Sequence, residues 1–177
     1  MPNNTSSAAS ANVVQPPDGA AVSAGPERRV SEQLITDWQK ETHRLGHALA
    51  FMMLDASAMS GPKWAHRFII AVNRVVEHSS LLLYGAGFAS LLGLPPEPDK
   101  SVPMPAQLPA RYVPVFTRGC IASSLSSVPI RMQGAVERDD GRQELYRVAF
   151  IALKLDASLR RPFALGAFNC RVVALET

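Results

Sequence analysis

Near the end of the chain, apolar and polar positions alternate with a period of two residues. From 130 to 137 the even-numbered residues are apolar or small, and the odd-numbered ones are mostly polar. This alternation is typical of a half-buried antiparallel strand. A second β-rich run begins at Gln143, and the pair Asp140-Gly141 lies between the two runs. Because Asp-Gly in this position favours a tight turn, we expect a β-hairpin here.

The second arm of this hairpin, residues 143–155, carries apolar residues on both of its faces. Tyr146, Val148 and Phe150 would share one face, and Ala149 and Ile151 the other. A strand of this kind needs a cover on each side of its sheet. We expect the second cover to be either an amphipathic helix from the N-terminal part of the chain or a partner chain. A further strand is expected over residues 163–173.

Residues 28–60 are expected to form an amphipathic N-terminal helix. Ser31 is a suitable N-cap, and Glu32 in the first turn would complement the helix dipole. Apolar residues then recur at steps of mostly three and four, which is the spacing of one helical stripe. The stripe includes Leu34, Ile35, Trp38 and Leu45. Because it is wider than a lone surface helix needs, we interpret this segment as a dimerisation or signal-transmission element.

The patterns between this helix and the hairpin are shorter. β-Branched and apolar residues favour a strand over 66–72, a second strand over 75–84 and a short helix over 88–94. Because short apolar runs also occur in buried helices, an all-helical structure over 63–93 remains an open alternative. The Pro-rich residues 95–109 predict a loop, and residues 107–125 predict a longer helix. Pro114 should kink this helix or delay its start.

Composition indicates one globular domain. The chain has 177 residues, of which 47% are hydrophobic and 19% charged, and its net charge is only +3. Scattered basic residues argue against a nucleic-acid partner, which usually meets a concentrated basic face. Residues 1–27 are mostly Ala, Ser, Asn, Pro and Gly and predict a disordered tail before the helix at 28–60 and a domain over 61–177. Neither a signal peptide nor a membrane-spanning stretch is evident, so we expect a cytoplasmic protein with no membrane partner.

Three stretches of the chain carry a family resemblance: Leu82 to Gly93, Ala110 to Tyr112, and Pro129 to Phe150 with its Asp-Gly-Arg tip. In their order they resemble PAS-type sensor domains, in particular the single-domain PAS-like proteins of alphaproteobacteria. The resemblance implies an α+β fold, with helices over one face of a five-stranded antiparallel sheet and here an amphipathic helix in front. It also implies a non-catalytic sensory or interaction module that responds to a ligand or to dimerisation.

A ligand of such a module would lie between the helices and the sheet. The side chains expected there are mostly aromatic, and such groups more often form only a packed core. They are Phe88, Tyr112, Phe116, Met132, Tyr146, Phe150 and Phe168.

Known cofactor chemistries find little support in the sequence. Asn169-Cys170-Arg171 echoes the cysteine motif of flavin-binding photoreceptor domains, but it lies on the expected last strand instead of a central helix. Haem-sensing relatives often supply a histidine from the long helix, and residues 107–127 contain none. His43 and His47 have metal-ligand spacing without a third ligand. Haem and flavin are therefore disfavoured, the cofactor stays unknown, and neither a metal site nor a catalytic residue is assigned.

Two other functions remain as alternatives. A small α+β isomerase or dehydratase would need His66 or His78 beside a carboxylate in an apolar cavity. A nucleic-acid-associated regulator would use four arginines of the hairpin, Arg131, Arg138, Arg142 and Arg147. For the preferred sensory function we expect a homodimer and a signalling protein as possible partner. Cys120 and Cys170 suit buried, reduced side chains, and a disulfide between them is the less favoured alternative.

Overall fold

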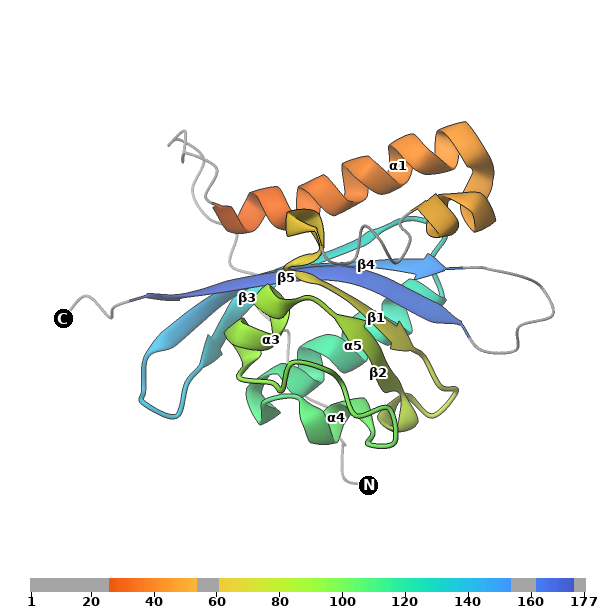
Figure 1. Ribbon diagram of the computed structural model, residues 1–177. Coiled ribbons are helices and arrows are strands. Elements are labelled where there is room, and N and C mark those ends of the chain that lie inside the picture. Colours follow the sequence, from red (N-terminus) through yellow and green to blue (C-terminus); the bar gives the residue numbers. More distant parts are fainter. Residues whose placement is uncertain (1–25, 54–60, 154–161, 174–177) are drawn as a thin grey trace, which may run out of the picture.

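The computed structural model describes residues 26–53, 61–153 and 162–173 of the chain. Its centre is a five-stranded antiparallel sheet with the strand order β2-β1-β5-β4-β3 (Figure 1). The strands are β1 (Arg67–Ala71), β2 (Ser80–Tyr84), β3 (Ile130–Glu137), β4 (Gln143–Leu153) and β5 (Phe163–Val173). The α+β architecture expected from the PAS resemblance is confirmed.

The predicted hairpin joins β3 to β4. Its register runs from Ile130 opposite Phe150 to Glu137 opposite Gln143. At the tip, Gly141 has a φ of +76°, which is the left-handed region that favours glycine. The N–H of Arg138 donates to the carbonyl of Arg142 at 2.9 Å and closes the turn. Asp140-Gly141 therefore forms the tight turn of the hairpin, as the sequence predicts.

The first two strands resolve the alternative between strand and helix. β1 agrees with the prediction for 66–72, but only the second half of 75–84 is strand, because η2 (Val76–His78) precedes β2 as a 3₁₀ turn. Side-chain bonds hold this turn: Asn73 Oδ1 accepts the N–H of Val75, and Ser79 Oγ accepts the N–H of Asn73. The predicted short helix is α3 (Ala86–Leu92), and η1 (Pro62–Trp64) lies before β1. An all-helical 63–93 is therefore wrong.

The middle of the chain contains one helix that the sequence did not indicate. α4 (Met104–Gln107) lies within the stretch predicted as loop, with prolines at its start, where no N–H is needed. The longer helix is α5 (Val113–Ser124), preceded by η3 (Ala110–Tyr112). Pro114 lies in the first turn of α5, so it delays the start of the helix and does not kink it.

The N-terminal helix α1 (Pro26–Met53) begins before Ser31, which lies inside it and not at its N-cap as predicted. The last two residues of the predicted tail belong to α1, and residues 1–25 lie outside the described part of the chain. So do residues 54–60, the end of the segment predicted as helix. No helix of the described residues is long and apolar enough to cross a membrane.

Both faces of the sheet are covered by the chain itself. α1 contacts β4 and β5 from one side, and α3, α4 and α5 lie on the other (Figure 1). The N-terminal helix is therefore the second cover, which the apolar residues on both faces of β4 predicted. Two apolar clusters result: an inner layer between the sheet and α3–α5, and an outer layer between the sheet and α1.

Candidate functional site

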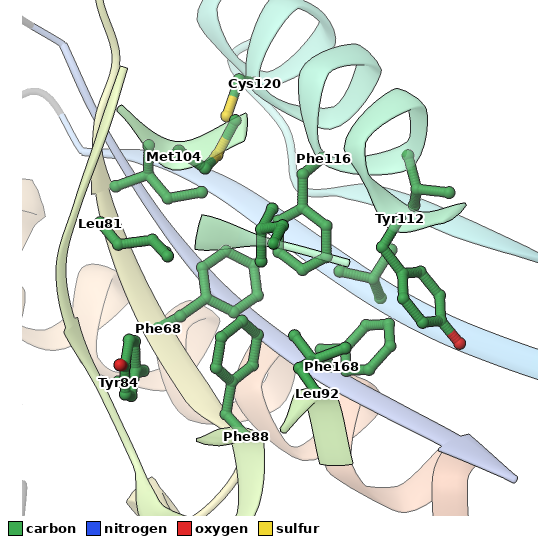
Figure 2. Close-up of a cluster of buried hydrophobic side chains, with 14 of the residues drawn as sticks. Phe68, Leu81, Tyr84, Phe88, Leu92, Met104, Tyr112, Phe116, Cys120 and Phe168 are labelled. Carbon is green, nitrogen blue, oxygen red and sulfur yellow. The ribbon is translucent and has the colours of Figure 1, made fainter. Parts of the chain in front are cut away.

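The inner layer is built around aromatic rings. Of the seven side chains expected there, six are buried and Met132 is half-buried against them. Phe68 of β1, which the sequence analysis had not singled out, lies among them, with its ring centre 5.1 Å from those of Phe88 and Phe116 (Figure 2). The prediction that these residues share one interior is confirmed. That they line a ligand space stays a prediction.

The rings fill most of the room between the helices and the sheet. Tyr112 and Phe168 pack edge to face with centres 5.0 Å apart, within the usual range for aromatic pairs. Gly119 of α5 allows the close approach of the helix, since a Cβ there would lie 2.1 Å from the ring of Phe150. A ligand would therefore have to displace or rotate rings. One end of this layer is polar.

At that end a buried carboxylate is held between three elements. Glu144 of β4 is 3% exposed. Its Oε2 accepts from Nε of Arg111 of η3 at 3.0 Å, and its Oε1 accepts from Nη1 of Arg138 and from Sγ of Cys170, each at 3.3 Å. Arg111 also lies over the ring of Tyr112, with 5.2 Å between Cζ and the ring centre. We call Arg111, Tyr112, Glu144 and Cys170 the polar end.

The protonation states of the polar end follow from burial and charge. Burial alone opposes ionisation of Glu144, but bonds from Cys170 and Arg111, the proximity of the Tyr112 hydroxyl and the charge of Arg111 outweigh it, so its pKa lies below the usual value. Burial and the neighbouring carboxylate raise the pKa of the Cys170 thiol to about 12. The thiol is therefore protonated at neutral pH and is a hydrogen-bond donor, not a nucleophile.

The hydroxyl of Tyr112 is the unusual atom of this site. It is buried and has no hydrogen-bond partner of acceptable geometry, although it lies near Glu144 and Cys170. Burial is the main cause that raises the pKa of Tyr112 above its usual value, and the nearby carboxylate of Glu144 adds to it, so the phenol is neutral. A buried polar atom without a partner is uncommon and costly. It marks a place where a polar group of a ligand, or a water molecule, gains a hydrogen bond.

Arg111 and Glu144 are not among the residues that the sequence singles out. One signal could have found Glu144: it shares the inward-facing parity of Tyr146 and Val148 on β4, where a charged residue is unexpected unless it is paired. No comparable signal exists for Arg111, because its contact with Glu144 joins residues that are far apart in the chain.

The outer layer uses the residues proposed for a dimer helix. Leu34, Ile35 and Trp38 are buried against the sheet within one chain, where they cluster with Ile69 and Ile151. They are therefore not a free dimerisation surface while α1 is docked. The side chain of Leu45 lies outside the described part of the structure.

Ion pairs add to this docking. Arg67 of β1 is buried, lies over the ring of Trp64 and donates from Nη2 to Oδ2 of Asp37 of α1 at 2.8 Å. Lys63 reaches the same carboxylate at 3.5 Å from an exposed position. Nearer the start of α1, Glu32 pairs with Arg131 of β3 at 3.1 Å. Of these, the Arg67–Asp37 pair should contribute most to stability, because the Arg67 side chain is only 4% exposed.

Replacing Asp37 with alanine is expected to lower the free energy of unfolding by about 1–3 kcal/mol, because it leaves the buried Arg67 without a charged partner. Lys63→Ala removes the exposed partner of the same carboxylate and should cost at most about 0.5 kcal/mol. Both tryptophans of the chain, Trp38 and Trp64, lie in the outer layer, so their fluorescence in a urea titration measures both variants. Equal decreases in the free energy of unfolding of the two variants would contradict the expectation that Asp37 stabilises the fold mainly through Arg67.

The histidines do not form the arrangement that the enzyme alternative requires. His78 is exposed, and His66 is half-buried with an unpartnered Nδ1 and a pKa lowered by burial. Within the described residues neither forms an ion pair with a carboxylate. His43 is exposed, and the side chain of His47 is outside the described part. The described residues contain no group of three or more His, Cys, Asp or Glu side chains able to hold a metal ion.

Three of the four hairpin arginines proposed for nucleic acid are occupied by carboxylates. Arg131 pairs with Glu32, Arg138 with Glu144, and Arg142 with Asp140 at 2.6 Å. These arrangements offset the positive charge that a phosphate backbone would need to meet. The nucleic-acid alternative therefore has weaker support, because three of its four arginines already face carboxylates.

A comparison with family models and one with curated proteins found no match. Among solved structures, the chain is similar to the PAS domain of a protein from Colwellia psychrerythraea, with 13% identity, 70% of this chain and 97% of that chain covered, and a TM-score of 0.44. It is also similar to the PAS domain of an HTR-like protein from Haloarcula marismortui, with 17% identity, 76% and 99% covered, and a TM-score of 0.35.

A third similar structure is the light state of the blue-light photoreceptor Aureochrome1 LOV, with 13% identity, 68% of this chain and 90% of that chain covered, and a TM-score of 0.39. At these values the likeness concerns the fold alone, so the function proposed next rests on the residues of this chain. The narrower likeness to alphaproteobacterial proteins, and the absence of haem and flavin, stay predictions.

Proposed function

We propose that this chain is a non-catalytic sensory or interaction module in which an event in the inner layer changes the docking of α1 on the outer face. The supporting observation is that the same two strands, β4 and β5, carry both layers. On β4, Val148 and Phe150 belong to the inner cluster, while Ala149 and Ile151 belong to the outer one. Because interiors are close-packed, a displacement of these strands on one side must be accommodated on the other.

The polar end indicates the kind of ligand that such a module would bind. The inner layer offers aromatic surface, and the Tyr112 hydroxyl and the Arg111–Glu144 pair offer hydrogen bonds at one edge. This combination favours a mostly apolar small molecule with one polar group that can bond to Tyr112. Signal output would follow from α1, whose apolar stripe becomes available to a signalling partner or to a second copy when α1 leaves the sheet.

Native mass spectrometry of the full chain, purified from its native host, tests this proposal. We expect a fraction of the protein to carry a small molecule that is released on denaturation. Tyr112→Phe should raise the Kd of this molecule at least about fivefold and thereby lower the loaded fraction, because a lost hydrogen bond to a buried group costs about 1 kcal/mol or more. Tyr146→Phe, the same change at a neighbouring inner-layer ring 6.0 Å away, is the matched control. A chain that retains nothing contradicts the ligand part of the proposal.

A further inference from the structure

Exposed apolar side chains gather at the end of the molecule where α5 stops. The described residues leave five large apolar side chains exposed, and four of them belong to the segments around η2 and the end of α5. They are Val75, Ile121, Leu125 and Val128. α5 and η2 contact each other, so these segments are neighbours in space as well. Apolar groups collected in this way on a surface indicate an interaction site.

Beside these side chains the surface forms a groove of about 590 Å³. Its walls are mostly apolar and come from the segment after β1, from η2, from the end of α5 and from the residue before β5; they include Val72, Val76, Ile121 and Pro162. Leu125, at its edge, is 86% exposed and projects from the C-terminal end of α5. A protruding leucine and an apolar groove thus share one patch, which we call the α5 patch.

Two opposite charges lie in or next to the α5 patch. Arg74 lines the groove, and Glu77 lies three residues further along, in η2. Both are exposed, and neither forms an ion pair within the described part of the chain. A two-fold interface brings each surface feature of one copy against the complementary feature of the other. Leu125 would meet the groove of the second copy, and Arg74 would meet its Glu77.

We propose that the α5 patch is the homodimer interface of this chain, with a second copy as its occupant. This interface is separate from α1, whose apolar residues Leu34, Ile35 and Trp38 are already buried against the sheet. It therefore leaves α1 free to move in either subunit. The proposal does not depend on the sensory function, because a dimer through the α5 patch is possible whether or not the inner layer binds a ligand.

Sedimentation equilibrium of the full chain over a concentration series tests the interface. The wild type should dimerise, and Leu125→Lys should raise the dimer Kd by at least about thirtyfold, because it places a charge where the leucine should enter the apolar groove of the second copy. Val172→Lys is the matched control, since Val172 is the one exposed large apolar side chain of the described residues outside these segments. It should leave the Kd unchanged within about twofold. Circular dichroism verifies that both variants are folded.

A charge exchange identifies the occupant as a second copy. Arg74→Glu and Glu77→Arg should each raise the dimer Kd about fivefold. Each substitution breaks both symmetry-related Arg74–Glu77 pairs between the two copies. The double variant Arg74→Glu/Glu77→Arg should restore the Kd. Monomeric wild type at every concentration overturns the proposal, even if another protein is found to bind the patch. A Kd that Leu125→Lys leaves unchanged, or a double variant no tighter than the single ones, also overturns it.

Discussion

Phe116→Ala is expected to lower the free energy of unfolding by about 3–5 kcal/mol. The ring of Phe116 is fully buried in the inner layer and lies within 6 Å, centre to centre, of the rings of Phe68, Phe88, Phe150 and Phe168. Its removal gives up the free energy gained by burying the ring. It also leaves a cavity that the neighbouring side chains can fill only in part. Urea denaturation measures the change.

Phe163→Ala is the control for this substitution. Phe163 is half-buried at the start of β5, against the outer layer, so its loss should cost about half as much or less. The cavity left by Phe116 should also be dry and apolar, and benzene should raise the melting temperature of Phe116→Ala but not that of the wild type. A loss below about 1.5 kcal/mol, with no effect of benzene, would contradict a tightly packed inner layer.

Glu144→Gln is expected to lower the free energy of unfolding by about 3 kcal/mol at pH 7. The substitution keeps the shape of the side chain but removes the charge that faces Arg111 and Arg138, whose side chains are 22% and 31% exposed. Because these two guanidinium groups keep some contact with water, the loss should lie at the lower end of the range for broken buried pairs. Glu137→Gln on the exposed side of β3 is the control and should have little effect.

The effect of Glu144→Gln should depend on pH. The pKa of Glu144 is lower in the folded state than the ordinary value of 4.5, so its ionised form stabilises the fold above that pH. As the pH falls below about 4.5, the unfolded chain takes up the proton first, and the advantage of the wild type over the variant decreases. It disappears below the folded pKa. Unfolding measurements from pH 7 to pH 3 follow this trend, and a difference that grows on acidification would contradict the ionised carboxylate.

The hairpin and the sheet's two covers were predictable because local chemistry determines them. Asp140-Gly141 matches the backbone conformation of the turn, and the alternation on β3 matches its half-buried position. On β4, apolar residues of both parities required two covers, and α1 is one of them. These signals lie within a few residues of each other, so one sequence is enough to interpret them.

Other features depend on contacts that a local pattern does not contain. The apolar stripe of α1 looks the same in the sequence whether it packs on its own sheet or on a second copy, which is why Leu34, Ile35 and Trp38 were interpreted as a dimer surface. The polar end likewise joins residues from η3, β4 and β5. The break within 75–84 depends on the side-chain bonds of Asn73 and Ser79, which interrupt an otherwise β-like run.

Native-state hydrogen exchange of α1 tests the central claim most directly, because the proposed function requires a helix that is docked but can leave the sheet. Amides of residues 30–43 should be protected, and they should open with a free energy clearly below that of β4 and β5, which report global unfolding. Asp37→Ala should lower the opening free energy of α1 by the same amount as the free energy of global unfolding, because the Arg67–Asp37 pair is lost in both processes. If α1 opens only together with β4 and β5, it is a fixed part of the core, and the proposed signalling role of α1 is wrong.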